Sequence, residues 1–119
     1  MISKFGTEIR KIRLKQGDSL RKMATKLGIS SAFLSAMEVG RKTIPMDYVD
    51  KIASLYSLSD EEKDTLLDSI NETNKRVSLE LEQMNEAQKN ISLVFARKIN
   101  TADEELLEKL RKALLEDDN

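Results

Sequence analysis

Carboxylates are the most numerous side chains in this sequence that could carry out acid–base or metal chemistry. The 119 residues include 21 Asp and Glu and 20 Lys and Arg, but neither cysteine nor histidine. Zinc sites, disulfides and His-based catalysis are therefore not expected. The acidic residues stand beside Lys and Arg, without a glycine-lined pocket or the spacing of metal ligands. We expect no enzymatic activity, no metal and no cofactor.

The charged residues are unevenly distributed along the chain. Residues 1–58 carry eleven Lys and Arg against five acids, a net charge of +6, and residues 59–119 carry nine against sixteen, a net charge of −7. This asymmetry suggests a front half that binds a polyanion and a back half that faces solvent or a protein partner. The sequence lacks both a signal peptide and an apolar run long enough to span a bilayer. A soluble, cytoplasmic protein that does not enter the membrane is expected.

The elements that must position these charges are helices. Apolar residues at three- and four-residue intervals predict five of them, over residues 3–16, 20–27, 30–39, 45–55 and 60–70. Ser19 is a predicted N-cap, Gly17 and Gly28 are predicted stop signals, and Pro45 suits a first helical position. The turn Gly28-Ile29-Ser30 joins the second helix to the third. Two short helices joined in this way form a helix-turn-helix arrangement.

The pattern changes after the polar stretch NETNKR at 71–76, which predicts a linker. Val77, Leu79 and Leu81 alternate with polar residues, and this period predicts a half-buried strand. An isolated strand leaves its edge hydrogen bonds unmade. We therefore expect these three residues to form the contact of a homodimer through strand pairing.

Two amphipathic helices are expected after the strand. Asn85 with Gln88, and Thr101 with Glu104, have the spacing of capping boxes at their starts. The fold class expected is mainly α: a five-helix helix-turn-helix domain followed by a small segment of one strand and two helices. The domains expected are 1–72, which would bind DNA, and 73–119, which would bind a second subunit or a protein partner.

The run SLRKMATKLGISSAFLSAMEVGRKTIP, residues 19–45, resembles the Cro/Xre family of helix-turn-helix regulators, which includes phage repressors. The resemblance covers about residues 5–70. Its most specific pieces are MA, KLGIS, LS and EVGRK, which stand at the family's spacing. It implies a transcriptional regulator whose partner is double-stranded DNA.

The resemblance also implies roles for individual residues. Helix 30–39 would be the recognition helix, with base contacts from Ser30, Ser31, Ala32, Phe33, Ser35 and Ala36. Relatives often contact phosphate through a Gln at the start of the second helix, but this position is Leu20 here. Phosphate contacts are therefore expected from other residues of this sequence, namely Ser19, Arg21, Lys22, Arg41 and Lys42. A structural ion pair of the family corresponds to Arg13 and Glu38. Ser and Ala cannot form the bidentate pairs that Arg, Asn and Gln form with bases, so we expect weak base readout by each subunit and specificity from two subunits and DNA shape.

Two functions remain open at this point. The first is a sequence-specific dimeric repressor, acting on its own operon through an inverted-repeat operator. The alternative is the antitoxin of a toxin–antitoxin pair, in which the acidic C-terminal segment would hold a basic toxin. The two share a DNA-binding domain, so a co-purifying small basic protein would distinguish them.

Overall fold

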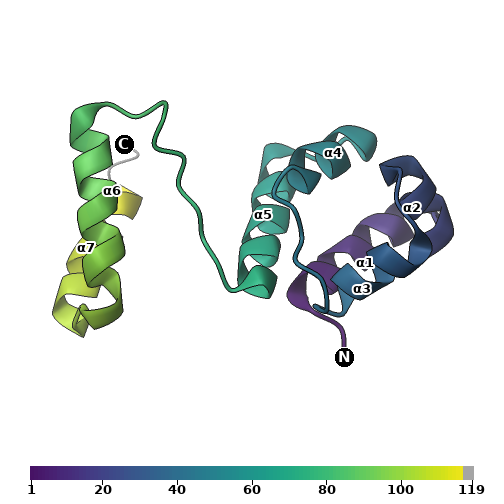
Figure 1. The fold of residues 1–119 in the computed structure, drawn as a ribbon, viewed down its shortest axis with the longest axis horizontal. Coiled ribbons are helices and arrows are strands. Elements are labelled where there is room, and N and C mark those ends of the chain that lie inside the picture. Colours follow the sequence, from purple (N-terminus) through teal and green to yellow (C-terminus); the bar gives the residue numbers. More distant parts are fainter. Residues whose placement is uncertain (117–119) are drawn as a thin grey trace. The chain divides into compact units, whose positions relative to one another are not determined.

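The computed structural model describes residues 1–116, and over this range the protein is helical, with seven α-helices and one 3-10 helix (Figure 1). Residues 117–119 of the predicted segment 73–119 lie outside the described residues. The chain divides into two compact units, 1–77 and a second that starts at Ser78. Among the described helices, none has the length and apolar character needed to cross a membrane.

Five helices form the N-terminal unit. They are α1 (Lys4–Gln16), α2 (Leu20–Leu27), α3 (Ser31–Glu38), α4 (Tyr48–Leu55) and α5 (Asp60–Asn74). The hydroxyls of Ser19, Ser30 and Ser59 each accept a hydrogen bond from the backbone N–H three residues later, and so start α2, α3 and α5. Gly17 and Gly28 end α1 and α2 with φ angles of 70° and 73°, a conformation that favours glycine.

A single apolar core holds these five helices together. α1 packs against α5 and α3, and α2 packs against α3 and α4. The largest fully buried apolar side chains are Phe5, Ile9, Met23, Leu34, Met37, Ile44, Ile52, Leu66 and Ile70. Complete burial of one such side chain contributes about 2 kcal/mol. The core therefore fixes the short helices α2 and α3, which are too short to be stable alone.

Two helix boundaries differ from those expected. α4 begins at Tyr48 rather than at Pro45, and α5 continues to Asn74, through most of the predicted linker. The extension is held by tertiary hydrogen bonds. Thr73 Oγ1 accepts the N–H of Phe5 at 3.0 Å, and the Asn74 amide both accepts from and donates to the backbone of Ile44 at 2.9 Å. Thr73 and Asn74, which belong to the predicted linker, are therefore hydrogen-bonded to the N-terminal unit.

The predicted strand at Val77, Leu79 and Leu81 is wrong, and with it the strand in the expected fold class. Over residues 1–116 the structure contains no strand, and the side chains of Val77 and Leu79 are 75% and 54% exposed. A strand is stabilised by cross-strand hydrogen bonds and side-chain pairs, and no described segment of this chain supplies them. The expected strand-paired dimer contact of these three residues loses its basis.

The C-terminal unit consists of α6 (Glu86–Lys98), the 3-10 helix η1 (Ile99–Thr101) and α7 (Glu104–Glu116). The predicted capping box of Asn85 and Gln88 is confirmed. The predicted cap at Thr101 is wrong, because Asp103 performs that role by accepting the N–H of Leu106 at 2.9 Å. No residue in α6, η1 or α7 is buried.

Candidate nucleic-acid interface

Helix α3 is anchored by one face and exposed on the other. Leu34 and Met37 are fully buried in the core. On the outer side Ala32 and Ser35 are exposed, while Ser31 and Ala36 are half-buried. Leu34 and Met37 follow helical spacing and share one face, so Ala32 and Ser35 lie on the opposite side of the helix. The exposed face of α3 therefore presents only small side chains.

Two residues that were predicted to contact bases, Ser30 and Phe33, already make contacts within the domain. Ser30 is exposed, but its hydroxyl already accepts the N–H of Phe33 at 3.0 Å, which leaves its own O–H to donate. The Phe33 side chain is half-buried and packs against the core cluster. It can therefore offer an edge of its ring, rather than a whole face, to an outside partner.

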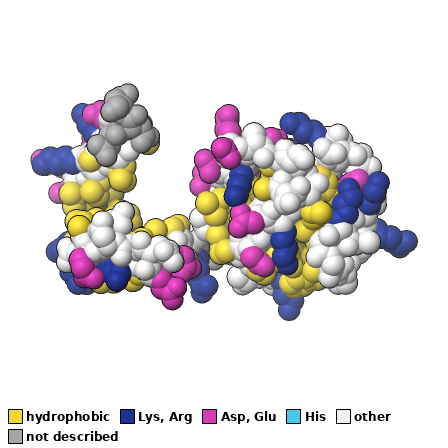
Figure 2. All heavy atoms as spheres, turned by 90° about the horizontal axis from the view of Figure 1, so that it is seen from above, with side chains coloured by type: hydrophobic (Ala, Val, Ile, Leu, Met, Phe, Trp, Pro, Cys, Tyr) yellow, Lys and Arg dark blue, Asp and Glu magenta, His cyan; other side chains and the backbone are white. Residues whose placement is uncertain are grey.

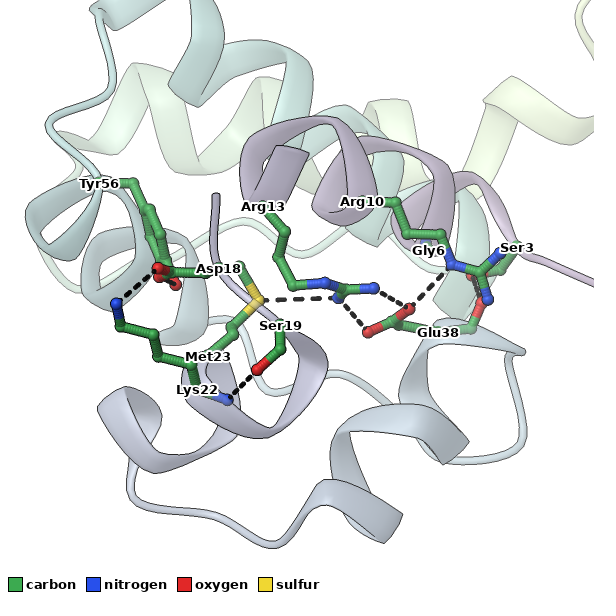
Figure 3. Close-up of polar contacts among 10 residues, drawn as sticks. All are labelled: Ser3, Gly6, Arg10, Arg13, Asp18, Ser19, Lys22, Met23, Glu38 and Tyr56. Atoms are coloured by element: carbon green, nitrogen blue, oxygen red, sulfur yellow. Dashed lines mark hydrogen bonds and ion pairs between the residues drawn. The ribbon is translucent and has the colours of Figure 1, made fainter. Parts of the chain in front are cut away.

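The last residue of α3, Glu38, is buried and held by α1 (Figure 3). Arg13 donates to it through two nitrogens, at 2.5 Å and 3.2 Å, and the half-exposed Arg10 donates at 3.2 Å. Paired guanidinium donors of this kind satisfy a buried carboxylate and fix its orientation. The angle between α1 and α3 is thus set by an ion-pair cluster as well as by apolar packing.

The backbone of Glu38 is held as firmly as its side chain. Its carbonyl oxygen accepts hydrogen bonds from the Ser3 N–H at 2.9 Å and from the Ser3 hydroxyl at 2.8 Å. Gly6 allows this close approach, because a Cβ at that position would lie 2.2 Å from the same oxygen. Gly6 and Arg10 were not predicted from the sequence, because neither shows a role until α1 and α3 are in contact.

Residues 9–63 match a protein-family model described as helix-turn-helix. These residues form a helix-turn-helix domain of the Cro/Xre family. The match spans α2, the glycine turn, α3 and α4, together with the later part of α1 and the first turn of α5. No match to the chain was found among curated proteins or solved structures. The predicted resemblance is confirmed, and the protein is a DNA-binding transcriptional regulator.

Four cations of the helix-turn-helix domain were predicted to contact phosphate. Arg21 and Lys22 lie in the first turn of α2, Arg41 and Lys42 follow α3, and all four are exposed. Ser19 is used as the α2 cap and accepts the N–H of Lys22 at 3.0 Å. The preceding first-turn N–H groups, at the positive end of the helix dipole, are suited to an anionic oxygen.

A buried carboxylate beside these cations escaped the sequence analysis. Asp18 accepts a hydrogen bond from Lys26 at 2.6 Å. It also accepts one from the Tyr56 hydroxyl at 2.8 Å, and Lys22 Nζ lies 3.5 Å from its carboxylate (Figure 3). The hydrogen bonds from Lys26 and Tyr56 lower the pKa of Asp18 to about 2. Burial and the Asp18 hydrogen bond raise the pKa of Tyr56 above its ordinary value.

This cluster ties the start of α2 to the end of α4. Asp18 lies just before α2, and Tyr56 just after α4. The ammonium group of Lys26 also lies 5.0 Å from the centre of the Tyr56 ring, within cation–π range. The start of α2, the helix that precedes α3, is therefore fixed in place. Lys22 remains exposed enough to reach a phosphate, but part of its charge is offset by Asp18.

Proposed function

We propose that this regulator is a dimeric repressor that binds an inverted-repeat operator, in the promoter of its own operon, through α3. The observation that carries the proposal is the outer face of α3, which is exposed at Ala32 and Ser35 while Glu38 and the core hold the inner face. A helix held in this way can enter a major groove as a rigid body. Its place of action would be the cytoplasm, where the promoter is.

In this proposal, the operator sequence is recognised through direct contacts with bases and through the shape of the DNA. Ser hydroxyls hydrogen-bond several bases and Ala touches a thymine methyl group, but neither forms the bidentate pairs worth roughly 1–3 kcal/mol of discrimination. Small side chains instead allow α3 to lie close to the base edges. Ser30, Ser31, Phe33 and Ala36 would extend this contact at its margins. Discrimination then depends on the deformability of the operator and on having two subunits.

The cations on either side of α3 supply the sequence-independent part of the affinity. Arg21 and Lys22 on α2, and Arg41 and Lys42 after α3, would contact phosphates and set the register of α3 on the duplex. Two subunits would then place their α3 helices in successive major grooves, about 34 Å apart, and exclude polymerase. The acidic C-terminal half would repel DNA and reduce non-specific binding.

The proposal is tested by selecting bound fragments from sheared genomic DNA at near-physiological salt, because phosphate contacts alone bind any sequence at low salt. We expect enrichment of an inverted repeat with half-sites about one helical turn apart. Enrichment of a single unrepeated site would contradict the dimeric mode. If no sequence is enriched, sequence-specific repression is ruled out.

A variant of α3 tests which surface reads the operator. Ala32→Glu places a negative charge on the exposed face, and we expect operator affinity to fall by at least about tenfold through repulsion from phosphate. Thr65→Glu is the matched control, since Thr65 is exposed on α5. The two variants should have the same melting temperature. Equal operator affinity of the two variants would exclude α3 as the reading helix.

A further inference from the structure

The C-terminal unit carries an apolar groove between its two long helices. Its lining includes a single charged residue, Lys98, and the apolar residues Ile91, Val94, Phe95, Ile99, Ala102, Leu106 and Leu110. Helical spacing places the α6 members on one face and the α7 members on another, and the two faces meet along the groove. Figure 2 shows hydrophobic side chains at the surface of this unit, which lies on the left of that view.

Nothing in the described chain covers this groove. Ile91 and Phe95 are 66% and 41% exposed, and Leu106 is 41% exposed. An amphipathic helix is stabilised mainly by burying its apolar face, and a pair of helices of this size does not bury enough surface alone. Exposed apolar surface of this extent, bordered by charges, is typical of an interaction site.

The charges of α7 indicate which partner fits. Its N-terminal half is acidic, with Glu104, Glu105 and Glu108, and its following turn is basic, with Lys109, Arg111 and Lys112. A second α7 running antiparallel would set the acidic half of each helix beside the basic turn of the other. A uniformly basic or acidic partner would match only one of the two halves. The pattern is therefore self-complementary, as a two-fold interface requires.

We propose that the groove is filled by a second copy of this chain, so that α6 and α7 of two subunits form an antiparallel four-helix bundle. Each subunit contributes Leu106, Leu110 and the apolar side chains of α6 to a shared core of the kind found between facing hairpins. The bundle replaces the strand pairing expected from sequence. This inference rests on the proposed dimeric function and identifies its interface.

The first test is the oligomeric state of the full-length protein by sedimentation equilibrium. We expect wild type to be a dimer at micromolar concentration, and Leu106→Asp to raise the dimer dissociation constant at least about tenfold by burying an unpaired charge. Leu93→Asp is the matched control, because Leu93 is 51% exposed and does not line the groove. A monomeric wild type, or equal dissociation constants for the two variants, would overturn the proposal.

A charge exchange keeps the test independent of folding defects. One variant carries Glu104→Lys, Glu105→Lys and Glu108→Lys, and the other carries Lys109→Glu, Arg111→Glu and Lys112→Glu. Each alone should be monomeric, because its α7 then bears charge of mainly one sign, and an equimolar mixture should form a heterodimer. Helix content by circular dichroism should match wild type. A mixture that stays monomeric would refute pairing through α7.

The result separates this interface from the function of the front domain. If wild type is monomeric yet still enriches an inverted repeat, the repressor assignment stands and the bundle does not. If it is dimeric through the groove but enriches no sequence, the bundle stands and the repressor assignment fails. A monomer that pairs with a small basic protein encoded beside its gene would instead favour the antitoxin role and overturn the bundle.

Discussion

Arg13 Nη1 lies 2.5 Å from Glu38 Oε2, and this contact joins the last turn of α1 to the last residue of α3. The Glu38 side chain is 2% exposed and that of Arg13 is 12% exposed, so water replaces neither partner effectively. Arg10 adds a second donor from the same face of α1. α3 is therefore oriented by a buried ion pair as well as by apolar packing.

Glu38→Ala should lower the free energy of unfolding by about 3 kcal/mol, because it leaves the Arg13 guanidinium without its buried partner. Arg10→Ala is the control, since the Arg10 side chain is 51% exposed and its loss should cost about 0.5 kcal/mol. Urea denaturation of the three proteins measures both values. If Arg10→Ala lowered the free energy of unfolding as much as Glu38→Ala, the buried Arg13–Glu38 pair would contribute nothing beyond the exposed Arg10 contact.

Gly6→Ala tests the close approach of α1 to the end of α3. Glycine to alanine within a helix normally stabilises by roughly 0.5–1 kcal/mol. Here the added Cβ would lie 2.2 Å from the Glu38 carbonyl oxygen, so the backbones must separate and break the Ser3 contacts. We expect a loss of about 1–3 kcal/mol instead. A thermal melt measures the direction of the change. A higher melting temperature for Gly6→Ala would disprove the close contact between Gly6 and the Glu38 carbonyl oxygen.

The Asp18 cluster should make stability depend on pH in acid. The pKa of Asp18 is about 2 in the folded protein and 3.8 in its ordinary state, so folding favours the ionised form. Its contribution is then complete above pH 4 and disappears as the pH falls through 2. The stability difference between wild type and Asp18→Asn should be largest near pH 6 and shrink towards pH 2. A difference that is constant over this range would argue against the cluster.

The proposed phosphate contacts of Arg41 and Lys42 predict a specific dependence of DNA affinity on salt. Removing both charges in Arg41→Ala, Lys42→Ala should reduce the slope of log K against log salt by about 2, since each phosphate contact contributes about 0.9. Lys11→Ala is the control, because Lys11 pairs with Glu8 on α1 at 3.2 Å. Fluorescence anisotropy on an operator duplex between 50 and 200 mM salt, a range where such contacts dominate, measures the slope. An unchanged slope in the double variant would remove these residues from the interface.

The helices of the front domain were predictable because their signals are local. Ser19, Ser30 and Ser59 cap the helices that follow them by accepting the N–H three residues ahead, and Gly17 and Gly28 end helices by their own backbone angles. The exposed and buried faces of α3 follow from helical spacing alone. The family resemblance added the pairing of Arg13 with Glu38, which joins positions 25 residues apart.

The parts that sequence reasoning missed depend on contacts between distant residues. Asp18 is buried because Lys26 and Tyr56 meet it, and Tyr56 is 38 residues away. Gly6 is required only because Glu38 lies against it. The strand at 77–82 was inferred from side-chain alternation, but a strand also needs a partner backbone, and alternation carries no information about one. The polar residues 71–74 suggested a linker, although Thr73 and Asn74 form hydrogen bonds with the backbone of core residues.

Thr73 is hydrogen-bonded to Phe5, and Asn74 to Ile44. These hydrogen bonds determine where the DNA-binding domain could be separated from the rest of the chain or joined to another. A fragment that stops at residue 72 would lose both contacts and loosen the start of α1 together with the segment before α4. A gene fusion that joins residues 1–76 to a different C-terminal half keeps them. Recombination between regulators would therefore preserve the fold of the DNA-binding domain when its crossover lies after Asn74, in the stretch that precedes α6.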